Sequence, residues 1–285
     1  MDDSVIDRVG KRLRCTWSWY SGRWKKVVNG QNLLGIVLTI NGKALPIHLL
    51  FCSKQGCKNT DKPSLLLSML SRLKEEFGKH DVDITTIPIT LDSWYVSEPL
   101  KQKLYELGFT NIVVVGKSNY VFSDGESKYS AYQWKKEIEY DSTLWGINVP
   151  AQRKTLSNPT FGGVNLLFFQ KSSTRSFYLI DFSTLSLRSV QMWRIWQAHN
   201  LIEQFWKILK SLLAIGSMRL RGDGLYTGLL IKIMAYLFVT SLQYYSSFCH
   251  LSLTQIIRQL RRESDLLTLL NEHFHLDFLG IPAIS

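Results

Sequence analysis

Cysteine is scarce in this chain, with 4 residues among 285. Cys15, Cys52, Cys57 and Cys249 are scattered, and the spacing of Cys52 and Cys57 gives no tight zinc knuckle without a matching His/Cys pair. The sequence therefore indicates no zinc site and predicts reduced thiols in a cytoplasmic protein. A secretory signal is lacking too, because no apolar segment follows the opening Met-Asp-Asp.

Long apolar runs are nearly absent. The one candidate, Leu225 to Leu242, is interrupted by Lys232 and barely reaches the ~20 residues that a bilayer requires. We interpret it as a helix buried against a sheet, with a membrane segment as the alternative. The chain also lacks internal repeats and low-complexity tracts, so repeat architectures are excluded.

Acidic residues are outnumbered by basic ones, 23 to 34, which gives a net charge of +11. Excess Lys and Arg favours a polyanionic partner, either nucleic acid or anionic lipid, over a merely basic surface. The apolar and charged fractions, 45% and 20%, are ordinary for a soluble protein. A chain of this length holds one large domain or two modest ones.

Turn signals and hydrophobic spacing predict an α/β fold. Two apolar runs, 33–40 and 45–51, flank Asn41-Gly42, which is typical of a β-hairpin. The segments that follow alternate between predicted helices at 64–77 and 97–107 and predicted strands at 82–91 and 111–115. This order suits a mixed sheet covered by helices whose first strand is truncated or missing, although the pattern alone selects no particular α/β fold.

The texture of the sequence changes twice along the chain. Between 117 and 188, short strand-like runs among Ser, Gly and Asn loops predict a β-rich insertion, with runs at 120–122, 130–134, 164–169 and 176–181. From Ser189 to about Phe274 the spacing is helical. We therefore expect residues 1–116 and 189–285 to form the two parts of a core that the insertion 117–188 interrupts.

The predicted helix 193–210 carries a mixed polar stripe. The stripe begins at Trp196 and continues 3, 7 and 14 residues further on with His199, Glu203 and Lys210. At about 100° per residue these offsets return to an arc of roughly 60°. Such a stripe favours a helix that presents a metal ligand to a phosphate backbone. The alternatives are a solvated glutamate and a buried, hydrogen-bonded imidazole.

Two further carboxylates lie far from Glu203 in sequence. Asp92 follows the apolar run 84–91, at the strand end where α/β sheets place their ligands, although it could serve only as an N-cap. Asp3 opens the chain with Asp2 as its neighbouring alternative, at a terminus where frayed, solvated side chains are common. Three such carboxylates are what two divalent ions about 4 Å apart need for in-line phosphoryl chemistry.

These motifs resemble the catalytic region of DDE transposases from the insertion-sequence group related to hairpin-forming cut-and-paste elements. That group has an Asp-Asp-Thr-like first motif and an Ala-Asp-Ser-Trp-Tyr-like second motif, and this chain has Asp2-Asp3-Ser4 and Asp92-Ser-Trp-Tyr95. Its third motif places Tyr, Arg, Glu and Lys at the spacing of the stripe on 193–210. Here Trp196 and His199 stand where Tyr and Arg are usual.

The resemblance implies an RNase H-like fold and DNA strand cleavage and strand transfer at element ends. Asp3, Asp92 and Glu203 would hold Mg²⁺, for which Mn²⁺ can substitute. The implied partners are double-stranded DNA, both transposon ends and target, and a second copy of the chain on paired ends, in the bacterial cytoplasm or nucleoid and with no membrane. Because the family's first Asp rides on a strand that begins earlier, the resemblance also implies an N-terminally truncated copy of reduced or lost activity. The alternative is a non-catalytic DNA-binding remnant or an inhibitor of transposition.

Further DNA contacts are expected on the same basis. The segments 116–119 and 218–222 are similar to family segments, and an aromatic residue of the insertion stacks on a flipped base in hairpin-forming members. The expected DNA-binding residues are Trp196, His199, Lys210, Arg219, Arg221, Lys117, Asn119 and Trp134. As a charged contact, His199 predicts that DNA affinity falls between about pH 6 and 8. Core or structural positions, rather than base stacking, are expected for Trp17, Trp19, Trp24, Trp134 and Trp145, with Trp134 as the candidate if one of them stacks on the base.

Overall fold

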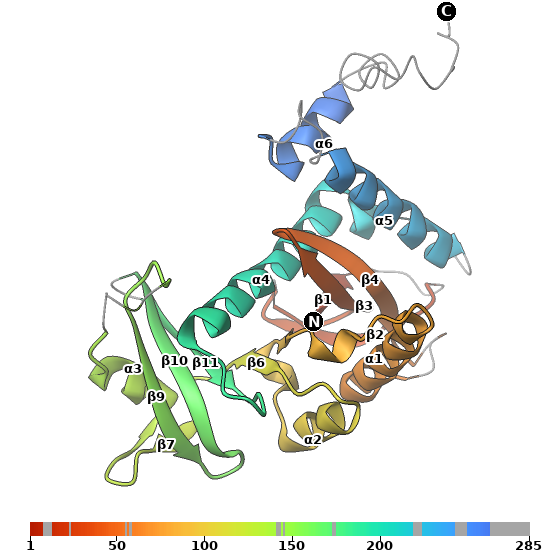
Figure 1. Ribbon diagram of the computed structural model, residues 1–285. Helices are drawn as coiled ribbons and strands as arrows, with labels where there is room; N and C mark the ends of the chain where they lie inside the picture. Colours follow the sequence, from red (N-terminus) through yellow and green to blue (C-terminus); the bar gives the residue numbers. More distant parts are fainter. Residues whose placement is uncertain are drawn as a thin grey trace, which may run out of the picture.

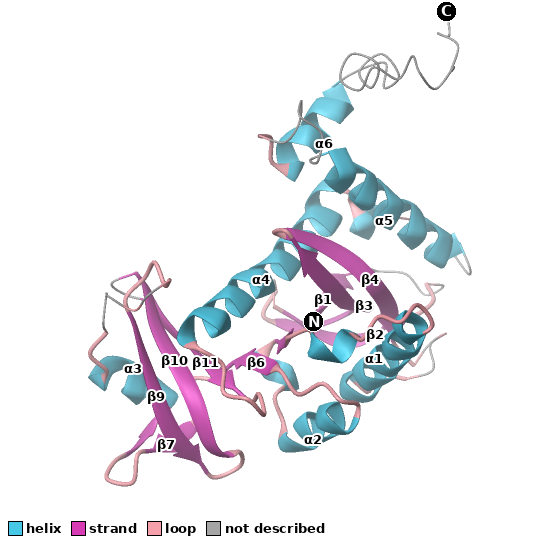
Figure 2. Cartoon of the chain, viewed as in Figure 1, coloured by secondary structure: helices cyan, strands magenta, loops and turns pink. Residues whose placement is uncertain are grey.

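Two β-sheets form the centre of the protein, and helices pack against both (Figures 1 and 2). The computed structural model describes residues 1–7, 13–22, 24–54, 56, 59–140, 144, 146–172, 175–218, 224–242 and 250–262. Its mixed α/β architecture, with a seven-stranded mixed sheet and a helical C-terminal part, confirms the predicted fold class.

The first sheet is built around one long strand. Its strands are β1 (Asp2–Asp7), β2 (Trp17–Ser21), β3 (Lys26–Ile40) and β4 (Lys43–Cys52). Asn41 and Gly42, with φ of 48° and 72°, close the β3–β4 turn, so the predicted hairpin is confirmed. Of the two expected alternatives, a truncated or a missing first strand, the missing one is wrong, because β1 pairs antiparallel with β3 from Asp2 onward.

The second sheet joins the segments on both sides of residue 117. Its order is β5 (Ile89–Leu91), β6 (Ile112–Val115), β11 (Arg175–Asp181), β10 (Gly162–Ser172), β9 (Ala151–Asn158), β7 (Val121–Ser123) and β8 (Lys128–Ser130). β5 and β6 are parallel, and β11 pairs antiparallel with β6 through Leu179 and Val115. The predicted β-rich insertion therefore extends the sheet that begins with β5 and β6.

Helices cover these sheets and connect them. The helical elements are α1 (Lys62–Gly78), η1 (Ile84–Thr86), η2 (Ser93–Tyr95), α2 (Glu98–Glu106), α3 (Ala131–Glu137), α4 (Ser189–Lys207), η3 (Ile208–Leu212, a π-helix), η4 (Ile215–Ser217), α5 (Gly224–Leu242) and α6 (Leu253–Arg262). α4 crosses between the two sheets and contacts β3 and β4 as well as β5, β6 and β11 (Figure 1). On α1, Leu66, Met69, Leu70 and Leu73 are buried, and burial of each such side chain stabilises the fold by roughly 1.5–3 kcal/mol.

Two predicted strands are wrong in part. Only Ile89–Leu91 of the predicted strand 82–91 is extended, because Asp83 caps the 3₁₀ turn η1 by accepting a hydrogen bond from the Thr85 amide at 2.9 Å. Residues 131–134 belong to α3, which a capping box starts: the Gln133 amide donates to Ser130 Oγ, and the Ser130 amide donates to Gln133 Oε1. The strand β9 was not predicted.

The apolar run 225–242 forms α5, as predicted. α5 is long and apolar enough, by length and composition, to cross a membrane, and no other helix among the described residues is. One face packs on the first sheet, where the Tyr236 hydroxyl donates to the Ala44 carbonyl of β4 at 2.9 Å. The other face leaves Leu230 58% and Met234 60% exposed. The helix is thus buried against the sheet along one side only.

The cysteines differ from the sequence expectation. Cys15 is disulfide-bonded, so the expectation of reduced thiols is wrong at this position. Cys52 is free and buried, and burial raises the pKa of its thiol to about 12, which makes it unreactive. Cys57 and Cys249 lie outside the described residues, as does the chain after Arg262.

Candidate functional site

A cleft of about 870 Å³ opens where the two sheets meet. The Met1 ammonium, at the start of β1, donates to the Thr90 carbonyl of β5 at 2.7 Å. This bond places the beginning of β1 beside the end of β5, so that Asp3 and Asp92 both line the cleft. Residues 89 positions apart in sequence therefore meet because one strand from each sheet contributes to the same wall.

Asp3 is held by three donors. Lys62 Nζ lies 2.6 Å and Asn32 Nδ2 2.5 Å from Asp3 Oδ2, while the Tyr95 hydroxyl donates to Oδ1 at 2.6 Å. A lysine in the first turn of α1 opposes the helix dipole, and the Asp3 carboxylate compensates it. Burial, and next the Asp3 charge, raise the pKa of Tyr95, so its phenol stays protonated and keeps donating.

Asp92 is the N-cap of η2. Its Oδ1 accepts a hydrogen bond from the Ser93 amide at 2.5 Å, which is the capping role that the sequence left open. Asp92 also lines the cleft, so the carboxylate that caps η2 is the same one that is predicted to bind a metal ion. A carboxylate has about four acceptor sites, so one hydrogen bond leaves capacity for a cation.

Asp2 carries the electrostatic signature of crowded carboxylates. Burial raises its pKa to about 7, and the Asp3 charge and, more weakly, the Asp92 charge add to this shift. A neighbouring anion disfavours ionisation, so the wall formed by these residues favours any cation that enters it. Hard oxygen donors of this kind suit Mg²⁺.

Glu203 is not part of this wall. It lies on α4 with an exposed side chain and is absent from the residues that line the cleft. Among the described residues no group of three or more His, Cys, Asp and Glu side chains is arranged to hold a metal ion. Two of the three predicted metal ligands therefore meet at the cleft, and the third does not.

The stripe on α4 does not face one environment. Trp196 is in the core, with its ring centroid 4.7 Å from that of Phe169 and 5.1 Å from that of Trp193. This packing contradicts the expected DNA contact of Trp196. The stripe misled because shared angular position on a helix does not reveal which side meets the sheet.

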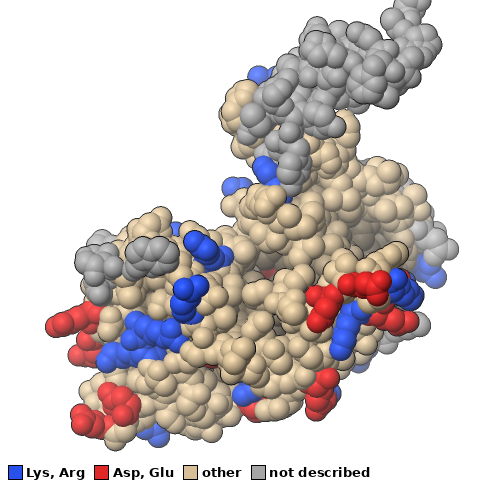
Figure 3. Space-filling view, viewed as in Figure 1, with Lys and Arg blue, Asp and Glu red and all other residues tan. Residues whose placement is uncertain are grey.

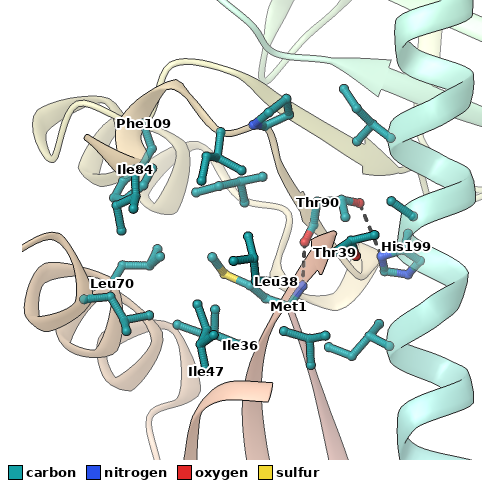
Figure 4. Close-up of a pocket in the computed structure, with 18 of the residues that line it drawn as sticks. Met1, Ile36, Leu38, Thr39, Ile47, Leu70, Ile84, Thr90, Phe109 and His199 are labelled. Carbon is teal, nitrogen blue, oxygen red and sulfur yellow. Dashed lines mark hydrogen bonds between the residues drawn. The ribbon is translucent and has the colours of Figure 1, made fainter. Parts of the chain in front are cut away.

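His199 is also buried, next to β5. Its Nδ1 lies 3.3 Å from Thr90 Oγ1 (Figure 4). Burial lowers the pKa of His199 to about 4, so the imidazole is neutral between pH 6 and 8. The predicted charged contact, with DNA affinity falling over that range, is therefore wrong for His199. The alternative of a buried, hydrogen-bonded imidazole is the one that the structure bears out.

The low pKa of His199 predicts how the free energy of unfolding depends on pH. In the unfolded chain this imidazole takes up a proton below about pH 6.5, whereas in the folded chain it does so only near pH 4. Because the unfolded state binds more protons over this window, the free energy of unfolding falls as the pH drops, by up to about 3 kcal/mol. His199→Gln lacks this term, so urea unfolding should show the variant gaining about 2–3 kcal/mol relative to wild type between about pH 7 and 4.5. An equal difference at both pH values would contradict a neutral His199.

Trp134 is another core residue. It is 4% exposed, and its indole N–H donates to the Phe122 carbonyl at 3.0 Å. This burial contradicts the expected stacking of Trp134 on a flipped base. The alternative of a core position is the one that the structure bears out for Trp134. Trp17 is 41% and Trp24 is 52% exposed, so these two are not core residues, and Trp145 lies outside the described residues.

The remaining predicted DNA contacts lie near the cleft or outside the described residues. Lys210 is exposed and lines the cleft. Lys117 Nζ lies 5.3 Å from the ring centroid of Trp94, a cleft residue that is 77% exposed, and Asn119 is exposed two residues further along. Arg219 and Arg221 lie outside the described residues.

Three residues of the cleft were not predicted as contacts from the sequence: Lys62, Trp94 and Tyr95. Trp94 and Tyr95 lie two and three residues after Asp92, and an aromatic residue this close to a predicted ligand is a usable signal. Lys62 gives no such signal, because only the pairing of β1 with β3 brings Asp3 to the start of α1.

Comparisons with protein-family models and with curated proteins return no match. Among solved structures, the chain is similar to a piggyBac transposase in a cryo-EM synaptic complex with hairpin DNA, with 18% sequence identity and a TM-score of 0.49. The alignment covers 100% of this chain and 54% of that one, so the chain spans about half the length of that protein. A likeness at this level assigns no function to the chain.

Proposed function

We propose that this chain is a transposase-type protein that cleaves DNA strands at element ends and transfers them to target DNA. The observation that carries the proposal is the meeting of Asp2, Asp3 and Asp92 on one cleft wall. The motif resemblance gives that wall its chemistry, because two of these carboxylates are the ones that match the family's first and second motifs. We further propose a homodimer on paired DNA ends in the bacterial cytoplasm.

Within this proposal, Asp3 and Asp92 supply the oxygen ligands for Mg²⁺, or for Mn²⁺ in its place. The bound ion would neutralise charge on the phosphate under attack and activate water or a 3′-hydroxyl. Tyr95 and Asn32 fix the orientation of the Asp3 carboxylate through its two oxygens. Lys62 holds the same carboxylate in the absence of another cation, so metal entry would require the ammonium to move aside.

Cations and aromatic rings around the cleft suit a DNA strand. Lys210 on the wall is placed to contact a phosphate, and Trp94 with Lys117 offers an exposed ring beside a positive charge. Lys and Arg side chains also gather over the β-strand-rich part of the protein, on the left of Figure 3. There Lys135, Lys136 and Arg175 line a second hollow. Such a distribution favours a polyanion that extends beyond the cleft.

Glu203 remains the proposed third ligand, and it would have to approach the cleft when metal or DNA binds. The rival function, a non-catalytic DNA-binding protein, is favoured by the exposed position of Glu203 and by the ion pair of Asp3 with Lys62. A nicking assay on supercoiled plasmid separates the two. We expect nicking with Mg²⁺ and none with EDTA, whereas the rival binds the plasmid in a strongly salt-dependent way and never nicks it.

Metal binding should also be visible without DNA. We expect Mg²⁺ to raise the melting temperature of the wild-type protein, because a ligand that binds only the folded state stabilises it by mass action. An ion present at about 100 times its dissociation constant adds roughly 2.7 kcal/mol. Asp3→Asn should lose this shift, whereas Asp7→Asn, on the same strand and lining the same cleft, should retain most of it. A shift of equal size in Asp3→Asn would contradict the assignment.

A further inference from the structure

A separate cavity, of about 300 Å³, is lined by Met1 and by residues of two strands and two helices (Figure 4). β3 contributes Ile36, Val37, Leu38 and Thr39 to its lining, and the stretch 87–90 that contains the start of β5 forms the opposite side. α1 covers it with Leu70, Leu73 and Phe77, and α4 covers it with residues between Arg194 and Ile202. The cavity thus lies between two strand edges and two helices.

The edge of β3 is open at this place, and the outer edge of β5 is open apart from the Thr90 carbonyl, which already accepts from Met1. On the edge of β3 that β1 occupies, pairing covers residues 30–35, and within the described residues no strand continues along 36–40. β5 pairs with β6 on one side, and on its other side the Met1 ammonium bonds to Thr90. An open edge presents unpaired amide and carbonyl groups, which is the template for adding a strand.

The dimensions of the cavity match a short strand. The stretch of α4 from Arg194 to Ile202 rises about 12 Å at 1.5 Å per residue. An extended segment of about four residues spans roughly 13 Å. The residues of β3 that line the cavity, Ile36 to Thr39, are the same number, so one segment would meet all of them.

We propose that this cavity is an acceptor site for an extended apolar peptide segment of another polypeptide, which bridges β3 of the first sheet and β5 of the second. Main-chain hydrogen bonds to the two edges give affinity, and the apolar lining selects β-branched or aliphatic side chains. Arg194 is exposed at the cavity, and no carboxylate side chain lines it within the described part of the chain, so an acidic residue flanking the segment fits best. Strand addition needs neither metal nor DNA and is independent of the proposed cleavage activity.

The test uses the full chain and a fluorescein-labelled synthetic peptide of about four β-branched residues, flanked by two lysines and a glutamate. We expect saturable binding by fluorescence anisotropy and new hydrogen-exchange protection at residues 36–40 of β3 and at Thr90 of β5. A peptide with proline at the second β-branched position should bind at least about tenfold more weakly, because proline removes a ladder donor. Equal binding of both peptides, protection elsewhere, or no binding would overturn the proposal.

A pair of variants tests the location. Ala198 lines the cavity from α4, so Ala198→Phe should fill it and weaken peptide binding at least about tenfold. Gln197→Phe adds the same ring at the neighbouring exposed position and should leave binding unchanged. If the cavity binds only a small apolar dye such as ANS, and no peptide, it is a small-molecule cavity and the strand-acceptor assignment fails.

Discussion

Replacing Asp92 by asparagine is expected to reduce Mg²⁺-dependent plasmid nicking by more than about a hundredfold. That factor is the upper loss typical of removing an outer partner of a metal site, and removal of a ligand itself costs more. The asparagine side chain can still accept the hydrogen bond from the Ser93 amide, so η2 keeps its cap and the fold is retained. DNA binding should be equal or tighter, since one negative charge leaves the cleft.

Asp83→Asn is the matched control for this variant. Asp83 is also the N-cap of a 3₁₀ turn, η1, and its side chain accepts from the Thr85 amide, but it is exposed and away from the cleft. Its exchange removes a carboxylate and preserves a cap, so nicking should be unchanged. If Asp92→Asn nicks the plasmid as fast as the wild type, or if Asp83→Asn loses as much activity, Asp92 is not a metal ligand.

Gly116→Ala should be among the most destabilising single changes in the protein. A Cβ atom at this position would overlap the ring tip of Tyr178. The ring cannot retreat easily, because it stacks on Phe168 with 5.5 Å between centroids and its hydroxyl donates to the Lys117 carbonyl at 2.6 Å. We expect a loss of about 3 kcal/mol in the free energy of unfolding, measured by urea denaturation.

The cause of that loss can be isolated by a double-mutant cycle. In a Tyr178→Leu background the overlapping ring tip is absent, so Gly116→Ala should cost less than about 1 kcal/mol. Gly163→Ala serves as the control. Gly163 also lies in a paired strand, opposite Ser157, but a Cβ atom there meets nothing within 4 Å. Additive losses in the two backgrounds would show that the overlap with Tyr178 is not responsible.

Local signals in the sequence predicted much of the fold. The β3–β4 hairpin rests on Asn41-Gly42, and α1 and α2 rest on helical spacing, so all three could be predicted within a few residues. The strand predicted at 82–91 failed because Asp83 and Pro88 favour a turn over an extended ladder. The arrangement into two sheets could not be predicted, since it depends on pairings between distant segments such as β1 with β3.

The candidate site divides in the same way. Asp92 and Asp3 could be selected because each belongs to a short motif, and the structure places both at one cleft. Trp196 and His199 were misassigned because helical periodicity gives angular position without identifying the buried side. Lys62 could not be found from sequence, because its partnership with Asp3 arises from tertiary packing alone.

The pairing of β11 with β6 has a consequence for biosynthesis. β5 and β6 form the edge of the second sheet that carries Asp92, and β6 meets its other neighbour only after β7 to β10 have been made. A chain emerging from the ribosome therefore exposes the inner edge of β6 while β7 with β8 and β9 with β10 pair as local hairpins. Strand pairings between segments distant in sequence form slowly. The unpaired edge of β6 is therefore the place where a nascent chain of this protein would first aggregate with another chain.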